Sequence, residues 1–442
     1  MADGAVSKDF RVQRQLDRLA AVASPGDRLG LDRISALLDR LGNPERNLPP
    51  VFHVAGTNGK GSTCAFLRAA AEAAGLSAHV YTTPHLTRLN ERIRLRGTLI
   101  ADDALAALLD ETISAAHGIE PSFFELTTAA AISAFACIPA DLCVIEVGMG
   151  GLRDATNVVH FPACCGIAQI AVDHRGMLGD RLECIAREKA GIAKHGTPLV
   201  TQAYSARVRQ EIDAAAAAAG AEWLPCGQRW EASIGDSGIH YRDAGGTLEL
   251  PLPRLPGDHQ AANAMLAVAM IRHQSRVAIP DAALRAAMEW IDWPARLQLL
   301  APGPLVQRLP TGSQLYLDGG HNPAAARATA EFFRGALPPD RPFHIVLGLL
   351  RRKDAAGVMK AFAARSLTLH PVPVHDHDCF SPAELHTFAR NARLNAVPAA
   401  GVGDALGWIA RHASGEKPPV VLVFGSLHLA GQVLEANLQT PS

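Results

Sequence analysis

Short apolar runs alternate with longer helical patterns along most of the chain. The first run, at 51–55, precedes a glycine-rich turn and a helical pattern over 62–74 that stops at Gly75. Further strands are predicted at 77–81, 141–148, 164–172 and 198–202, and helices at 125–138, 181–192 and 260–273. Strands that alternate with helices are typical of a largely parallel sheet with helices on both faces. The pattern therefore predicts an α/β fold.

The pattern changes twice farther along the chain. From about 222 to 255, short β-like pieces with Gly and Pro predict a small β sub-region, and at 293–305 prolines interrupt the sequence. Beyond this break, strand-like runs return at 314–320, 343–350, 366–374 and 420–426. Such a break is typical of a domain boundary. We therefore expect one domain over 1–294 and a smaller α/β domain over 295–442.

Composition and charge restrict the class of protein. The 442 residues exceed what a single core usually holds, so the length predicts two or three domains. A net charge of −1 without a dense Lys/Arg run argues against nucleic acid or an anionic membrane as the main partner. The eight cysteines form no C-x-x-C pair, the polar N-terminal segment has no apolar signal region, and no stretch approaches a membrane span. These features predict a cytoplasmic protein.

The segment 51–75 carries the strongest signal for chemistry. Its turn, GTNGKGS over 56–62, lies between a strand and a helix. Such a turn points backbone N–H groups and a helix N-terminus at a phosphate, and its lysine neutralises charge. The spacing differs from the Walker A pattern, because Gly56 precedes Lys60 by only four residues. The alternative is an ordinary strand–turn–helix with a solvated lysine; we favour a phosphate site.

Polar side chains follow several of the predicted strands. Thr83 and His85 lie just past the strand at 77–81, Glu146 ends the next apolar run, and Asp173 and His174 follow another. In open α/β sheets, ligands bind outside the carboxyl ends of the strands. Each residue alone is also a common loop residue. Together they place hydroxyl, carboxylate and imidazole groups beside the phosphate loop, which favours a metal–nucleotide site.

A series of motifs extends this picture over nearly the whole chain. In order they are GTNGKGST, TTPHLTRLNERIR, FFELTT, EVGMGGLRDATN, DHRGMLG, REKAGIAK, HQAANA, WPAR, DGGHNP and FGSLH. From about residue 27 to 430 the chain resembles the folylpolyglutamate synthase / dihydrofolate synthase family of the Mur ligase superfamily. The resemblance implies an N-terminal P-loop ATP-binding domain of the Mur ligase type with a mostly parallel sheet. A smaller Rossmann-like C-terminal glutamate ligase domain is expected to follow it.

The resemblance implies a ligase of folate biosynthesis and one-carbon metabolism. Members of the family use ATP to convert a pterin-linked carboxylate to an acyl phosphate, which the amine of L-glutamate then attacks. The implied ligands are ATP, two Mg²⁺ ions, L-glutamate, and dihydropteroate or tetrahydrofolate, and a monomer is implied. The early covering segment and compact length favour a bifunctional dihydrofolate synthase and folylpolyglutamate synthase. A single-activity enzyme and an inactive nucleotide-binding paralogue are the alternatives.

The resemblance also assigns roles to particular residues. ATP contacts are implied at Gly56, Thr57, Asn58, Gly59, Lys60, Gly61, Ser62, Asn263, Arg296, Asp318 and His321. Magnesium ligands are implied at Thr83, Glu146 and His174, and pterin or folate contacts at Ser122, Phe123, Phe124, Glu125, Arg153, Asp154 and Ala155. The implied catalytic residues are Lys60, Lys189 and His174.

The resemblance carries further expectations for Lys189, for the two phenylalanines and for an early segment of the chain. Lys189 matches a lysine that is carboxylated on its amine and orients a second Mg²⁺; the alternative is an ordinary lysine on a helix surface. Phe123 and Phe124 either stack on the pterin or only pack their own helix. The segment 27–44 corresponds to a loop that covers the pterin in the family.

The chain departs from the family pattern at four positions. Thr83 replaces a serine but keeps its hydroxyl, and the arginine of GGRLDATN moves one place along to Arg153. Ala295 replaces the glycine of PGR, and Arg352 replaces the first aspartate of DKD. None of these changes removes an implied catalytic group, and together they leave the substrate range more open than the chemistry.

Overall fold

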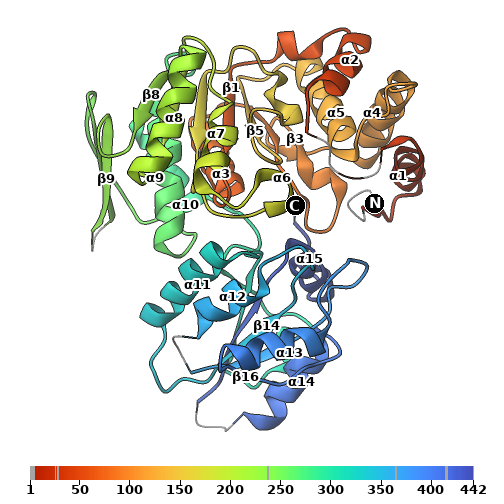
Figure 1. Ribbon diagram of the computed structural model, residues 1–442, viewed down its shortest axis with the longest axis vertical. Coiled ribbons are helices and arrows are strands. Elements are labelled where there is room, and N and C mark those ends of the chain that lie inside the picture. Colours follow the sequence, from red (N-terminus) through yellow and green to blue (C-terminus); the bar gives the residue numbers. More distant parts are fainter. Residues whose placement is uncertain are drawn as a thin grey trace. The chain divides into compact units, whose positions relative to one another are not determined.

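The computed structural model describes residues 5–24, 26, 29–235, 238–363, 366–413 and 417–441. Two compact units are present. The first holds the chain up to Arg254 together with His259–Asp292, and the second holds Leu255–Asp258 and Trp293–Pro441 (Figure 1). No helix in the described ranges is long and apolar enough to cross a membrane.

The first unit is built on an eight-stranded sheet with the order β4-β3-β2-β5-β1-β6-β7-β8. The strands from β2 to β8 in this order are all parallel, whereas β3 and β4 form an antiparallel hairpin at one edge. The bounds of the strands in this sheet are β1 Val51–Ala55, β2 Ala78–Tyr81, β3 Ile93–Leu95, β4 Thr98–Leu99, β5 Leu142–Glu146, β6 Cys164–Ile167, β7 Pro198–Thr201 and β8 Glu222–Pro225. The predicted, largely parallel sheet is therefore confirmed.

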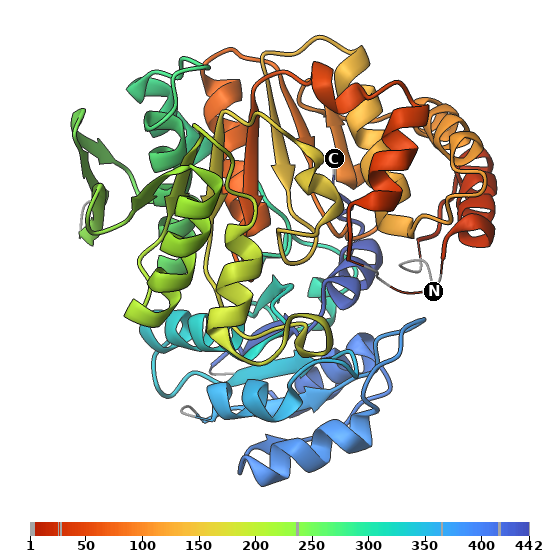
Figure 2. The same cartoon turned by 45° about the horizontal axis from the view of Figure 1, so that its top comes forward.

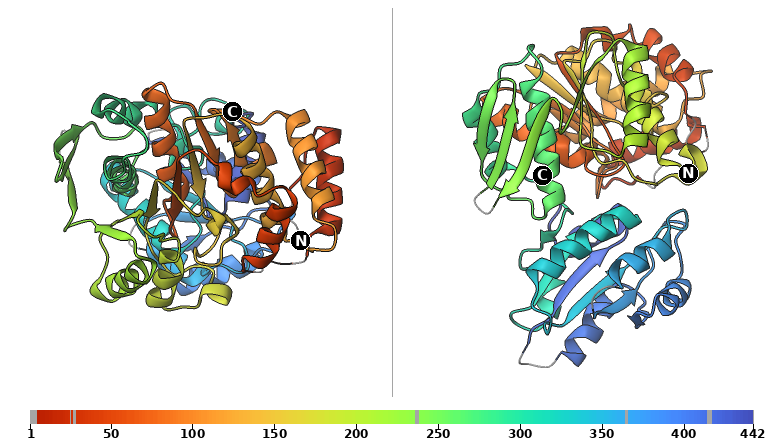
Figure 3. Two further views of the ribbon diagram at one scale, coloured as in Figure 1. Left: turned by 90° about the horizontal axis from the view of Figure 1, so that it is seen from above. Right: turned by 60° about the vertical axis from the view of Figure 1, so that its left-hand side comes forward.

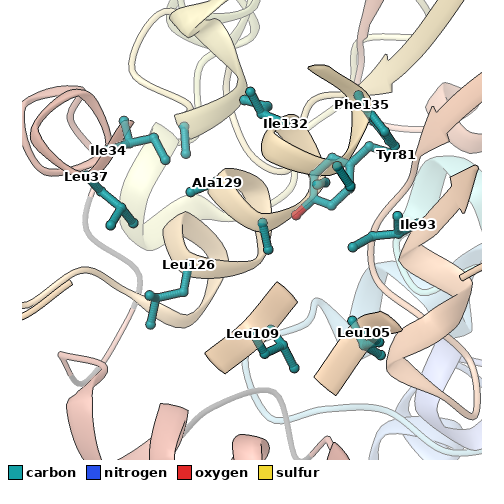
Figure 4. Close-up of a cluster of buried hydrophobic side chains, with 14 of the residues drawn as sticks. Ile34, Leu37, Tyr81, Ile93, Leu105, Leu109, Leu126, Ala129, Ile132 and Phe135 are labelled. Atoms are coloured by element: carbon teal, nitrogen blue, oxygen red, sulfur yellow. The ribbon is translucent and has the colours of Figure 1, made fainter. Parts of the chain in front are cut away.

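Helices cover both faces of this sheet. On one face a continuous core joins β1, β2, β3 and β5 to α1 Phe10–Val22, α2 Asp32–Arg40, α4 Asp102–Ala115 and α5 Phe123–Cys137 (Figure 4). Farther along the same face, α7 Leu182–Ala190 and α8 Ala206–Ala219 cover β6 and β7. The opposite face carries α9 Asp258–Arg272, whose Met270 approaches Gly166 so closely that a Cβ there would lie 2.2 Å from the sulfur.

The remaining elements of the first unit are further helices, several short turns and one small sheet. Helix α3 Lys60–Ala73 follows β1 and packs on α10 Asp281–Trp290, and a short helix α6 spans Arg175–Leu178. The 3₁₀ turns are η1 Pro44–Asn47, η2 Leu89–Arg92 and η3 Ala155–Val158. The N-terminal helices lie at the end of the unit away from the small green sheet (Figure 2).

That small sheet is the predicted β sub-region. It is antiparallel, with the order β11-β10-β9 and the bounds β9 Trp230–Gly235, β10 Gly238–Asp243 and β11 Gly246–Leu250 (Figure 3). A half-buried ion pair between Asp243 and Arg272, with Nε 2.7 Å from Oδ2, joins β10 to α9, and β11 packs on α10. These contacts attach the small sheet, which shares no strand with the larger one.

The second unit has a six-stranded sheet with the order β12-β13-β17-β14-β15-β16. Only β12 is antiparallel to its neighbour in this sheet. The strands are β12 Gln298–Leu299, β13 Gln314–Asp318, β14 Phe343–Leu347, β15 Thr368–Pro371, β16 Asn395–Ala396 and β17 Val420–Phe424. The helical elements are η4 Val306–Arg308, α11 Pro323–Ala336, α12 Ala355–Phe362, α13 Pro382–Asn391, α14 Val402–His412 and α15 Leu427–Ala436.

Several strands are shorter than the sequence predicted. The runs 141–148 and 164–172 leave the sheet at Glu146 and Ile167, and the run 366–374 ends at Pro371. Beyond these points Val147, Ala168 and Val372 are buried without belonging to a strand, whereas the apolar residues at 170–172 are only half-buried. Helix α3 in contrast begins at Lys60, two residues before the predicted start at 62, because Gly59 turns the chain with φ +85°.

Candidate active site

The loop between β1 and α3 has a backbone that requires its glycines. Gly56 has φ +153°, and a Cβ at this residue would lie 2.9 Å from the Cβ of Ala168. Gly59 has φ +85°, and a Cβ there would lie 2.2 Å from Oδ1 of Asn263. The backbone N–H groups of Thr57 and Asn58 donate to the carbonyl oxygen of Gln169 at 2.7 and 3.3 Å. The structure therefore brings Asn263 of α9 against the loop, as the predicted nucleotide contacts require.

The start of α3 gathers positive charge and unused hydroxyl groups. Nζ of Lys60 lies 3.4 Å from the carbonyl oxygen of Thr57 and 3.9 Å from Oε1 of Glu146. The hydroxyl oxygens of Ser62 and Thr63 are buried and have no hydrogen-bond partner among the described residues. Buried hydroxyl groups without partners are costly, and the N-terminus of a helix attracts anions. This end of α3 therefore fits the phosphates of a nucleotide.

Two of the three predicted magnesium ligands lie together. Glu146 at the end of β5 is 5 % exposed, and its Oε2 accepts a hydrogen bond of 3.0 Å from the backbone N–H of Thr83. A carboxylate and a hydroxyl are oxygen ligands of the kind Mg²⁺ takes. His174 begins α6 with φ +51°, and its backbone N–H donates to Oδ1 of Asp173 at 2.8 Å. No group of three or more His, Cys, Asp or Glu able to hold a metal occurs in the described ranges.

Lys189 is buried on α7 beside the same loop. It is 3 % exposed, and its Nζ donates to the carbonyl oxygen of Gly56 at 2.8 Å. Burial and, after it, the charge of Lys60 lower the pKa of this lysine to about 7, against the opposite effect of nearby carboxylates. The alternative of an ordinary surface lysine is therefore wrong. Near neutral pH, a substantial fraction of this amine is uncharged and nucleophilic.

The predicted folate segments meet the predicted covering segment. Ser122 and Glu125 form a capping box at the start of α5, with the backbone N–H of Ser122 donating to Oε2 of Glu125 at 2.6 Å. The guanidinium of Arg33, on α2, pairs with the same carboxylate at 3.0 Å. The backbone N–H of Gly30 donates to the carbonyl oxygen of Arg153 at 3.0 Å. Asp27 and Arg28 of the covering segment lie outside the described residues.

Arg153 joins the second predicted folate segment, 153–155, to α7, the helix that carries Lys189. Its backbone N–H and its guanidinium donate to the two carboxylate oxygens of Glu188, each at 3.2 Å. A Cβ on Gly151 would lie 2.7 Å from the carbonyl oxygen of Glu188, so the two backbones are in close contact. The neighbouring Asp154 is fully buried and accepts from the backbone N–H of Met149 at 2.7 Å. Burial raises the pKa of Asp154 above its ordinary value.

Both phenylalanines of the first predicted folate segment, 122–125, pack within the protein. The Phe124 ring lies 6.2 Å from the ring of Tyr81, and a Cβ on Gly148 would lie 2.4 Å from its tip. Phe123 is 8 % exposed and is contacted by the guanidinium of Arg92. Packing of their own helix therefore accounts for much of the surface of both rings.

In the second unit, the predicted nucleotide contacts surround the end of β13. The carboxylate of Asp318 accepts from the backbone N–H groups of Leu297 and Gly320 at 2.8 and 2.7 Å. Nδ1 of His321 lies 3.0 Å from the carbonyl oxygen of Gly319, and the guanidinium of Arg296 donates to the carbonyl oxygen of Ala295 at 2.9 Å. Arg296, Asp318 and His321 are thus held close together within this unit.

Sequence reasoning missed several residues that hold this site. Gln169 fixes the phosphate loop and lies inside a run that was assigned to a strand. Arg33 and Glu188 have charged side chains that are indistinguishable from surface residues in a single sequence. Their roles appear only in their partners, Glu125 and Arg153.

The sheet, the glycine loop and the carboxylate that ends β5 define a nucleotide-binding α/β protein. The Dihydrofolate synthase/folylpolyglutamate synthase of Escherichia coli (strain K12) is 34 % identical over 412 residues, which cover 92 % of this chain and 91 % of that protein. The chain belongs to the dihydrofolate synthase/folylpolyglutamate synthase family. The predicted family is confirmed, although no protein-family model matches the chain.

Solved structures agree with this assignment. FolC of E. coli in complex with DHPP and ADP has a TM-score of 0.85 at 32 % identity, covering 96 % of this chain and 97 % of that chain. The bifunctional folylpolyglutamate synthase/dihydrofolate synthase of Yersinia pestis, complexed with AMPPNP and Mn ion, has a TM-score of 0.84 at 31 % identity, covering 96 % and 97 %. The expected fold class is therefore also confirmed.

Proposed function

We propose that this protein is an ATP-dependent ligase that adds L-glutamate to dihydropteroate and to tetrahydrofolate. One observation carries the proposal: Lys60, Lys189 and Asn263 converge on a single glycine loop beside Glu146. The folate segment is tied to the helix of Lys189 through Glu188. Relatives that bind ADP, AMPPNP, Mn and DHPP support this reading.

The chemistry explains why such a site is needed. A carboxylate anion repels an amine, and it has no group able to leave. Transfer of the γ-phosphoryl group of ATP to the carboxylate gives an acyl phosphate and ADP. The glutamate amine then attacks the acyl carbon, phosphate leaves, the amine loses a proton, and an amide remains. The N–H groups at the start of α3 and Lys60 are proposed to hold the negative charge of the phosphates.

Thr83, Glu146 and His174 are proposed to hold magnesium. The donor set fits the metal, because Glu146 and Thr83 supply oxygen atoms beside the loop. When bound, the metal spreads the charge of the transferred phosphoryl group. The place of His174 in this set rests on the family resemblance.

Lys189 is proposed to carry a carboxylate on its amine. The neutral amine adds to CO₂, a C–N bond forms, and one proton is released, which leaves a carbamate anion. One N–H remains on Nζ, so the hydrogen bond to Gly56 can persist. A pKa of about 7 supplies the neutral amine that this reaction requires. A second magnesium ion would be oriented by the new anion.

Isotope labelling tests the modification directly. Protein equilibrated with ¹³C-labelled bicarbonate at pH 8 is expected to show one carbamate carbon resonance that is lost in Lys189→Ala. The resonance should weaken at pH 6, because protonation of the amine removes the nucleophile. A spectrum without this resonance at pH 8 would exclude carboxylation.

Within this proposal, residues 1–294 form the ATP-binding domain and 295–442 the glutamate ligase domain of a monomer in the cytoplasm. Arg296, Asp318 and His321 are the nucleotide contacts of the second domain. Ser122 to Glu125 and Arg153 to Ala155 contact the pterin or folate.

Turnover separates the alternatives. ADP release by the purified protein is measured with dihydropteroate or tetrahydrofolate as acceptor, each with and without L-glutamate. The bifunctional reading expects glutamate-dependent release with both acceptors. Release with one acceptor identifies a single-activity enzyme, and release with neither identifies an inactive nucleotide-binding paralogue.

A further inference from the structure

His85 lies near the proposed metal ligands, but the proposed function gives it no role. It follows Thr83 in the loop after β2 and is 8 % exposed. Nε of Arg92 donates to Nδ1 of His85 at 3.0 Å. Since an arginine Nε–H can only donate, Nδ1 must be the acceptor. The imidazole is therefore neutral, with its proton on Nε2.

Arg92 reaches a second part of the proposed site. Its side chain is among the largest fully buried ones in the protein. The guanidinium carbon lies 5.3 Å from the centroid of the Phe123 ring, a distance typical of a cation–π contact. Phe123 is the first residue of α5, directly after Ser122. One buried guanidinium thus contacts both the loop of Thr83 and the start of the folate-side helix.

The rest of this loop is fixed from the same 3₁₀ turn, η2. The carboxylate of Glu91 accepts hydrogen bonds of 2.7 to 2.9 Å from the backbone N–H groups of Leu86, Thr87 and Arg88. The loop therefore has little freedom after His85. Its first part is held by the contact between His85 and Arg92, by the hydrogen bond from Thr83 to Glu146, and by the backbone N–H of Thr82, which donates to the carbonyl oxygen of Arg92 at 3.1 Å.

We propose that His85 and Arg92 are a buried positioning pair that holds the Thr83 loop against the start of α5. Through this pair, the geometry of the metal ligands and that of the folate-side residues depend on each other. This inference rests on the proposed function for the identity of the two ligands. The pair acts on the two ligands through Thr83 and Phe123.

Two binding measurements test the pair without turnover. The first is the dissociation constant of Mn²⁺ in the presence of AMPPNP, read from the electron paramagnetic resonance of free Mn²⁺. The second is the dissociation constant of dihydropteroate, read from its fluorescence. His85→Leu is expected to weaken both by about tenfold, as loss of support behind metal ligands commonly does. In His85→Asn, Oδ1 can accept from Arg92, and binding is expected to return to within about twofold of the original.

His79 provides a matched control. It is a buried histidine on the preceding strand, with Nε2 2.8 Å from the carbonyl oxygen of Ile138 and Nδ1 accepting from the backbone N–H of Arg96 at 3.2 Å. His79→Leu is expected to lower the melting temperature but to leave both dissociation constants unchanged. If His85→Leu behaves in the same way, the pair is only structural and the proposal is wrong.

A second variant covers the case in which His85→Leu does not fold. Arg92→Lys keeps the positive charge but removes the Nε–H donor, so it is expected to weaken both ligands while His85→Asn does not. Unchanged binding in Arg92→Lys overturns the pairing. If the original protein shows no glutamate-dependent ADP release, the proposed function fails, but the Mn²⁺ measurement still decides the role of the pair in the loop.

Discussion

Each unit buries a base whose pKa is strongly lowered, but the surroundings of the two bases differ. In the first unit, Lys189 contacts Gly56 of the glycine loop, with Lys60, Asp173 and Asp154 near enough to influence its charge. In the second unit, Nδ1 of His344 lies 3.1 Å from Nε2 of His370, and burial lowers the pKa of each to about 4. A perturbed pKa alone therefore does not identify a functional residue; the neighbours must also be able to act on a ligand.

The neighbours of the histidine pair are aromatic rather than ionic. The ring of Trp408, on α14, lies 5.1 Å from the His370 ring and stacks on His412 at 3.9 Å. No glycine loop or carboxylate contact of this pair appears in the described structure. We infer that the histidine pair packs the second unit, whereas Lys189 serves the reaction. The difference can be tested at both sites.

The largest effect is expected at Lys189. Lys189→Ala removes the proposed carbamate and should lower kcat by at least about 100-fold, since electrostatic groups in a closed site contribute effects of this size. Added acetate should restore part of the activity. His370→Gln is the comparison and should keep kcat within about twofold while lowering the melting temperature. Full activity in Lys189→Ala would remove the distinction between the two buried bases.

A second large effect is expected at Gly59. Gly59→Ala forces a Cβ to within 2.2 Å of Oδ1 of Asn263 in a backbone with φ +85°, so the loop must shift. The affinity for ADP, measured by calorimetry, should fall by about tenfold or more. Gly335→Ala in α11 is the control, because a Cβ there meets no atom within 4 Å. Equal ADP affinity in both variants would mean that the loop tolerates displacement.

The sequence located the strands, the glycine loop and Lys189 better than it located the contacts between distant residues. The strand at 51–55, its glycine loop and Lys189 could be located because local pattern and family motifs mark them. That Asn263 presses on Gly59, or that Arg33 pairs with Glu125, depends on how distant helices pack. The sequence pattern also overextended the strands at 141–148 and 164–172, because the loops that follow these strands are as apolar as the strands themselves.

A smaller effect concerns stability at low pH. The folded pKa values of His344 and His370, about 4, lie below the ordinary value of 6.5. Between these values the unfolded chain binds more protons, so this contribution to stability is complete above pH 6.5 and is lost as the pH falls toward 4. We expect each histidine of the pair to contribute up to about 3 kcal/mol to the free energy of unfolding of the second unit across this window.

Urea unfolding at pH 7.0 and pH 4.5 measures this contribution. The double variant His344→Gln/His370→Gln has no ring to protonate and should show a smaller difference between the two pH values. Kinetic activity at pH 7.0 should be almost unchanged in this variant. An equal pH dependence in the original and the variant would show that other groups govern acid unfolding.

The smallest effect is expected at Ala295, a residue of the second unit whose backbone has a left-handed conformation. Ala295 is fully buried and has φ +55°, which costs about 1 kcal/mol for a residue with a Cβ. Ala295→Gly removes this strain but also loses a buried methyl group and adds freedom to the unfolded chain, each worth about 0.8 kcal/mol. The change in the free energy of unfolding should therefore stay below about 1 kcal/mol.

The control is Ala326→Gly, at an equally buried position in α11. This variant relieves no strain and should cost about 1 kcal/mol more than Ala295→Gly, as measured by urea unfolding. Equal losses in the two variants would show that the left-handed backbone at Ala295 is not strained.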